Sequence, residues 1–85
     1  MNAESILIEI RCPGVNHADD CVVSRSMTVR DLCRQYLELL SETAGISFGN
    51  YPEAVLMSQR LGCALSPDLT LDQQGVDSGD TLFLI

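Results

Sequence analysis

Basic residues are scarce in this chain of 85 residues, which has five Lys and Arg against twelve Asp and Glu and a net charge of −7. The two arginines that stand one helical turn apart, Arg30 and Arg34, have Asp31 and Glu38 beside them. Binding to nucleic acid or to an anionic membrane depends on clustered positive charge. The composition therefore argues against both as partners.

Long apolar runs are missing too. The longest cover residues 54–57 and 82–85, whereas a helix that crosses a membrane needs about 20 apolar residues. Residues 1–5 have neither the positive charges nor the apolar segment of a secretory signal peptide. We therefore expect a cytoplasmic protein without direct membrane insertion, folded as a single domain over residues 1–85.

Closely spaced cysteines are absent as well. The chain has four cysteines: Cys12, Cys21, Cys33 and Cys63. Successive gaps of 9, 12 and 30 positions do not fit a zinc ribbon, a thioredoxin-like pair or an iron–sulfur cluster. Cys33 and Cys63 are expected to be small buried hydrophobic residues, one on a helix and one in a short strand.

The other two cysteines, Cys12 and Cys21, flank a hairpin loop that contains His17. A metal site there would need Asp19 or Asp20 as a fourth ligand, and no familiar spacing supports it. A disulfide is disfavoured in a reducing compartment. His17 is expected to be solvated, and so small a domain offers little cleft for catalysis. We expect no metal, no cofactor and no enzymatic activity.

Strand and helix signals follow one another without repeats or linkers. Residues 5–11 alternate isoleucines with charged residues, Leu7 being the exception, and this pattern predicts a half-buried strand. A turn at residues 12–14 and a loop lead to a second strand at about residues 20–25. The two segments predict a hairpin.

The clearest element is a helix. Thr28 is a suitable N-cap, Asp31 favours the exposed N–H groups of the first turn, and Gly45 suits a left-handed C-terminal cap. Between the caps, apolar side chains fall on one broad face: Val29, Leu32, Cys33, Tyr36, Leu37, Leu39, Leu40 and Ala44. We expect this face to pack against a sheet.

A loop over residues 46–52 follows the helix, and its aromatic residues, Phe48 and Tyr51, are expected to close one end of the core. Residues 53–59 predict a third strand, and a turn leads to a short fourth strand that ends at Leu65.

The last part of the chain predicts one more turn of helix and one more strand. Thr70 is a plausible cap for a short helical turn that ends at Gly75. Residues 82–85 are apolar at every position, as in a strand covered on both faces. The order ββαββ, with a helical turn before the last strand, predicts an α+β fold. We expect a mixed sheet of five (or four) strands wrapped around one helix, with the first and last strands parallel at its centre.

The end of the chain carries the most specific pattern. It reads Thr70-Leu71, Gly75-Val76, Gly79-Asp80 and finally Leu82-Phe83-Leu84-Ile85. With the element order above, this ending resembles ubiquitin-like β-grasp domains, and most closely the bacterial YukD/EsaB proteins encoded with type VII (WXG100, or Esx) secretion systems. Conjugated ubiquitins and sulfur carriers continue to a Gly-Gly tail, which this sequence lacks.

The resemblance also implies an interaction surface, because ubiquitin-like domains usually bind through the exposed face of the sheet. The positions that correspond are Leu56 on the third strand with Phe83 and Ile85 on the last. The neighbours in these strands are then expected to point inward: Val55, Met57, Leu82 and Leu84. Three outward apolar side chains would form a contiguous patch. The alternatives are that a loop covers them or that the register is shifted by one residue, which would exchange the two faces.

The function implied by the resemblance is a non-catalytic protein-interaction module, an accessory or regulatory component of a bacterial type VII secretion system. Its partner would be a protein, such as a secretion-system component. Three alternatives stay open: a tail-less relative of the sulfur carriers, an adaptor domain of another bacterial pathway, and self-association through the same sheet face.

Overall fold

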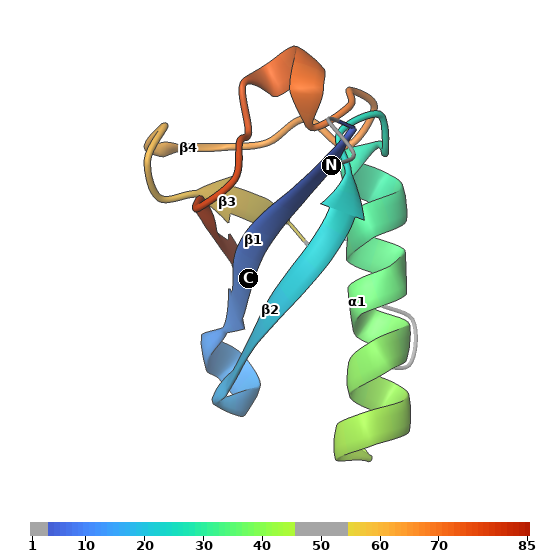
Figure 1. Ribbon diagram of the computed structural model, residues 1–85. Helices are drawn as coiled ribbons and strands as arrows, with labels where there is room; N and C mark the ends of the chain where they lie inside the picture. Colours follow the sequence, from blue (N-terminus) through green and yellow to red (C-terminus); the bar gives the residue numbers. More distant parts are fainter. Residues whose placement is uncertain (1–3, 46–54) are drawn as a thin grey trace.

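The computed structural model describes residues 4–45 and 55–85. Its elements are β1 (Ser5–Cys12), the 3-10 turn η1 (Pro13–Val15), β2 (His17–Ser24), α1 (Val29–Ala44), β3 (Leu56–Ser58), β4 (Cys63–Ala64), the 3-10 turn η2 (Asp72–Gln74) and β5 (Thr81–Leu84). One long helix lies along a twisted sheet, and both β1 and β2 run beside it (Figure 1). None of the helices in the described ranges is long and apolar enough to span a membrane.

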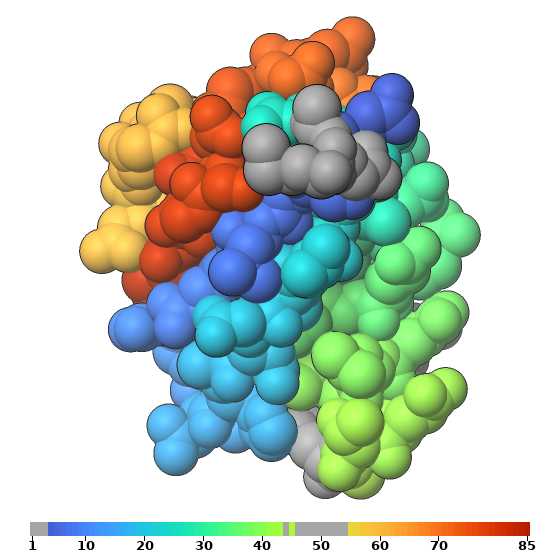
Figure 2. Space-filling model, viewed as in Figure 1, coloured from blue at the N-terminus to red at the C-terminus, as the bar shows by residue number. Residues whose placement is uncertain are grey.

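The five strands form a single mixed sheet in the order β2-β1-β5-β3-β4. The central pair, β1 and β5, is parallel and places Ile10 beside Leu82, whereas the other three pairs are antiparallel. This is the predicted α+β arrangement with five strands, and it confirms the parallel pairing of the first and last strands. In Figure 2 the atoms of β1 (blue) and β2 (cyan) lie next to one another, and the red C-terminal segment lies on the other side of β1.

The core lies between the sheet and α1. Alternate residues of β1 and β5 point into it, namely Ile6, Ile8, Ile10, Leu82 and Leu84, and each is buried. The helix contributes buried side chains at helical spacing: Val29, Leu32, Cys33, Tyr36 and Leu40. The predicted alternation in β1 is therefore confirmed. Leu39, predicted on the same helix face, is exposed at the edge of that face.

The ends of α1 are fixed by local contacts. The Thr28 hydroxyl accepts a hydrogen bond from the Asp31 amide at 3.2 Å. At the other end, Gly45 adopts φ 66° and its amide donates to the Leu40 carbonyl. A side chain is disfavoured at this positive φ, so glycine ends the helix at low conformational cost. Both predicted caps are confirmed.

Each strand differs from its predicted bounds, and β2 and β3 differ most. Strand β2 begins at His17 rather than near residue 20, because the η1 turn shortens the loop and lets all eight residues of β1 pair with β2. Strand β3 covers Leu56–Ser58, and β4 is only two residues long. The predictions for residues 46–54, including those for Phe48 and Tyr51, lie outside the described residues.

A buried tyrosine connects the helix to the hairpin. The Tyr36 hydroxyl donates to Asp19 Oδ2 at 2.9 Å and lies 3.3 Å from the Ile10 carbonyl oxygen. Burial, followed by the hydrogen bond to Asp19, raises the pKa of Tyr36 well above its ordinary value. The hydroxyl therefore stays protonated and links α1, β1 and β2.

We predict that Tyr36→Phe lowers the free energy of unfolding by about 1 kcal/mol, since it removes one net hydrogen bond from a site that otherwise keeps its packing. Urea denaturation followed by circular dichroism would measure this. In a double-mutant cycle with Asp19→Ala, the two losses should sum to more than the loss in the double variant. Strict additivity would show that the bond contributes nothing.

Candidate functional site

One row of side chains crosses all five strands on the face of the sheet opposite the helix, which we call the outer face. The strand register places Ala18, Arg11, Phe83, Met57 and Ala64 side by side in this row. Ala18, Arg11 and Ala64 are exposed, and Met57 and Phe83 are partly exposed. Their neighbours along each central strand are buried, so the row belongs to the solvent side.

Next to this row lies a second apolar pair. The backbones of Val55 and Ile85 exchange two hydrogen bonds, 3.1 and 3.0 Å long. Their side chains are 39% and 59% exposed. Together with Met57 and Phe83 they form four neighbouring apolar side chains on β3 and β5 and at their ends, which we call the apolar strip. A cluster of neighbouring apolar side chains that are exposed to solvent is typical of an interaction surface.

The prediction for β3 was wrong by one residue. Leu56 is only 1% exposed and packs in the core, whereas Val55 and Met57 face outward. For β5 the prediction is confirmed in its orientation: Leu82 and Leu84 are buried, Ile85 is exposed and Phe83 is partly exposed. Leu56 therefore does not belong to the surface.

Ser58 shares the buried face of β3 with Leu56, although it is polar. Because side chains alternate between the faces of a strand, Ser58 points the same way as Leu56, and a polar residue suggests the solvent side. In the structure Ser58 is 2% exposed, and its hydroxyl accepts a hydrogen bond from the Leu61 amide at 3.1 Å. This bond lets a serine occupy a core position. The pairing of β3 with β5 was the signal that could have shown that Met57 faces outward. Directly paired residues lie on the same face of a sheet, and Met57 is paired with the outward-facing Phe83.

A shallow hollow lies at the β1–β2 turn end of the same row. Its volume is about 280 Å³, and its lining is Arg11, Pro13, Asn16, His17, Ala18 and Phe83. Arg11 Nε donates to Glu9 Oε1 at 2.8 Å. Within residues 4–45 and 55–85 the two terminal nitrogens of Arg11 have no hydrogen bond or ion pair. The hollow thus combines an available guanidinium group with the edge of the apolar strip.

The far corner of the outer face has an apolar pair of its own. Leu7 and Val22 are direct cross-strand neighbours and are 51% and 73% exposed. The acidic pair Glu9 and Asp20, together with Arg11, separates them from the apolar strip. The exception noted for Leu7 in the sequence is therefore real, and the outer face carries two distinct apolar areas.

The cysteines and His17 form no metal site among the residues that the structure describes. Among the described residues, none of the four cysteines is in a disulfide. Cys33 is buried as predicted, but Cys63 is exposed, because the two-residue strand β4 lies at the edge of the sheet. Burial, followed by the charges of Asp19 and Asp20, raises the pKa of Cys21, and burial raises that of Cys33. Both effects disfavour the reactive thiolate.

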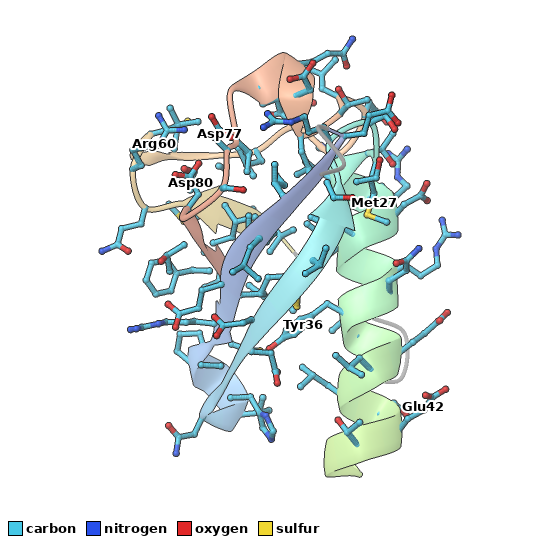
Figure 3. The ribbon with its side chains drawn as sticks, in the orientation of Figure 1. Met27, Tyr36, Glu42, Arg60, Asp77 and Asp80 are labelled. Carbon is cyan, nitrogen blue, oxygen red and sulfur yellow. The ribbon has the colours of Figure 1, made fainter. Side chains whose placement is uncertain are left out.

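The turn before β5 is held by a clasp of charged side chains (Figure 3). Asp80 is 6% exposed and accepts hydrogen bonds from Arg60 Nε at 2.7 Å and Arg60 Nη2 at 2.8 Å. Its second oxygen also accepts from the Asp77 amide at 2.9 Å. The same arginine donates to the Gly75 carbonyl. This clasp ties the β3–β4 turn to the start of β5 and so positions the apolar strip.

The contacts of this clasp, which consists of Arg60, Asp77 and Asp80, lower the pKa values of its two carboxyl groups. The hydrogen bonds from Arg60 lower the pKa of Asp80 below its usual range, although burial opposes this. The Ser78 amide and then Arg25, whose Nη2 lies 3.0 Å from Asp77 Oδ1, lower the pKa of Asp77. Both carboxylates are therefore stabilised in their charged form.

Known proteins provide a structural match and no sequence match. No protein-family model matches the chain, and no curated protein matches it. A structure described as molecular mimicry of SUMO that promotes DNA repair is similar at a TM-score of 0.75, with 18% identity over 100% of this chain and 95% of that one.

Two further structures extend the match. A protein designed on the basis of ubiquitin gives a TM-score of 0.69 and 26% identity, covering 99% of this chain and 90% of that one. The ubiquitin-like domain of an Arabidopsis thaliana protein gives 0.72 and 15%, covering 98% and 78%. This chain therefore has the ubiquitin-like β-grasp fold, with a sheet whose outer face carries the apolar strip.

Proposed function

We propose that this chain is a non-catalytic protein-interaction module that docks a partner protein on the apolar strip. The observation that carries the proposal is the set of two adjacent apolar pairs, Val55 with Ile85 and Met57 with Phe83, left uncovered by the described residues. Its structural similarity to other ubiquitin-like domains supports the same conclusion. The strip replaces the predicted set of Leu56, Phe83 and Ile85, of which only the last two remain.

The second part of the proposal concerns the cellular system in which this chain acts. The resemblance of the ending from Thr70 to Ile85 to YukD/EsaB proteins supports an accessory role in a bacterial type VII secretion system, in the cytoplasm. On this proposal the partner is a secretion-system protein. The alternatives are an adaptor in another bacterial pathway and a relative of the sulfur carriers, whose partners would be enzymes of sulfur transfer.

A capture experiment tests the docking surface. The tagged chain, co-expressed with an untagged copy in its native cell, is compared with a Phe83→Asp, Ile85→Asp variant whose fold is checked by circular dichroism. We expect the variant to bind the captured partner at least about 30-fold more weakly, since anchors at the centre of an interface contribute about 2 kcal/mol or more. The matched control is Leu69→Asp, because Leu69 is also an exposed apolar residue and lies outside the apolar strip.

The outcomes separate the alternatives. A secretion ATPase or a WXG100 protein among the lost partners supports the type VII role, and sulfur-transfer enzymes support the alternative. Recovery of the untagged copy through the same residues would indicate self-association. If the folded variant keeps all its partners, or if Leu69→Asp loses them equally, the apolar strip is not the docking surface.

A further inference from the structure

The hollow beside the apolar strip differs from the rest of the surface in its charge. The chain carries a net charge of −7, but the lining of the hollow contains Arg11 and no carboxylate. His17 also lines the hollow, and its Nδ1 lies 3.9 Å from Asp19 Oδ2. The nearest acidic group on β1, Glu9, is bonded to Arg11 Nε, which fixes the guanidinium group while leaving its terminal nitrogens unengaged within the described ranges.

Arg11 is also different from the other arginines. One terminal nitrogen of Arg60, Nη2, donates to both Asp80 and Gly75, and the two terminal nitrogens of Arg25 contact Asp72 and Asp77. Arg30 and Arg34 are paired with Asp68 and Asp31 through their terminal nitrogens. Counting contacts with residues 4–45 and 55–85 alone, Arg11 is thus the arginine whose two terminal nitrogens are both unengaged. It stands on the outer face in the same row as Phe83.

A carboxylate is the group that this arrangement suits. Two terminal guanidinium N–H groups match the two oxygens of a carboxylate, and the bonds are charge-assisted. Phe83 and Pro13 line the same hollow and offer an apolar contact beside the guanidinium group. On a chain with a net charge of −7, a contact between Arg11 and a carboxylate of the partner would also help to fix the orientation of that partner.

We propose that the hollow receives an Asp or Glu side chain of the partner protein, bound by the terminal nitrogens of Arg11, while an adjacent apolar side chain of that partner packs on Phe83. This rests on the proposed function, because it assigns the chemistry of the partner that docks on the apolar strip. Glu9 acts as a positioning residue that holds the guanidinium group toward the hollow.

Two small probes of nearly the same size and shape, one charged and one neutral, test the proposal. 3-Phenylpropionate carries a ring and a carboxylate, and 3-phenylpropionamide carries the same ring and a neutral amide. Each is titrated into ¹⁵N-labelled protein, and chemical shifts are followed at the Arg11 Nε–Hε group and at the backbone amides of Phe83 and Met57. The variants are Arg11→Gln and, as the matched control, Arg34→Gln, which removes an exposed arginine on the helix.

We expect the acid to bind about two- to fivefold more tightly than the amide, the range that an exposed ion pair contributes. The preference should disappear or reverse in Arg11→Gln, because the net negative charge then repels the acid, and it should persist in Arg34→Gln. Equal binding of both probes to the wild type overturns the proposal, as does a preference that survives in Arg11→Gln.

Absence of any perturbation by either probe overturns it as well. The docking surface itself is decided independently by the capture experiment with the Phe83→Asp, Ile85→Asp variant. A partner lost from that variant but retained by Arg11→Gln would leave the proposed function standing and remove the carboxylate contact.

Discussion

Leu82→Ala is expected to lower the free energy of unfolding by about 3–4 kcal/mol, a large part of the stability of a domain of this size. Leu82 is fully buried and lies beside Ile10 on the central parallel pair of strands and opposite Ser58 on β3. Truncation would leave a cavity at the point where three strands and the helix layer meet. The measurement is urea denaturation followed by circular dichroism, with the slope of the transition checked for change.

Two variants control this experiment. Leu82→Met keeps the volume of the side chain and should cost less than about 1.5 kcal/mol. Phe83→Ala changes the neighbouring residue, which faces the other side of the sheet, and should cost clearly less than Leu82→Ala because the ring is partly exposed already. If Phe83→Ala proved the more damaging of the two, the inward and outward faces of β5 would be exchanged.

Asp80→Ala is the second change with a large expected effect, a loss of about 2–3 kcal/mol. The buried carboxylate accepts two hydrogen bonds from Arg60 and one from the Asp77 amide, and hydrogen bonds to charged groups contribute about 1.5–3 kcal/mol. The expected loss is smaller than the sum of the three hydrogen bonds, because the Arg60 side chain is half exposed and water can solvate it once Asp80 is removed. Asp68→Asn, which changes an exposed ion pair, should cost less than about 0.5 kcal/mol.

The same carboxylate gives stability a pH dependence. Its pKa in the folded protein lies below the ordinary value of 3.8, so the unfolded chain takes up the proton first as the pH falls. The contribution of Asp80 is therefore complete above that ordinary value and is lost as the pH falls through the lower folded value. Denaturation midpoints compared between pH 7 and pH 3 should fall less in Asp80→Asn than in the wild type. An equal fall in both would contradict a role for the clasp.

Elements whose signals are local could be predicted from the sequence. Thr28 and Gly45 define both ends of the helix through contacts within one turn, and the alternating isoleucines of β1 define its buried face. The Gly79-Asp80 turn and the apolar run after it predicted β5. In each case the residues that determine the conformation are neighbours in the sequence.

The candidate site could be predicted only in part, because its two strands depend on each other. Residues Val55, Leu56 and Met57 are apolar in succession, so alternation alone does not say which of them faces outward. The answer comes from pairing with β5, which aligns Met57 with Phe83. Arg11 was visible as a charged residue on β1, but its position beside Phe83 follows from a parallel register over a separation of 72 residues.

The parallel pair at the centre of the sheet also determines when this protein can fold. β1 is synthesised first of the described strands and β5 last, yet each is the neighbour that covers the other's edge. Such distant pairing slows folding, because a long loop must close before its contacts form. On the ribosome, the edge of β1 that pairs with β5 stays uncovered after the β1–β2 hairpin has formed, until β5 has left the exit tunnel. During that interval the nascent chain exposes an unpaired strand edge, which is prone to aggregation.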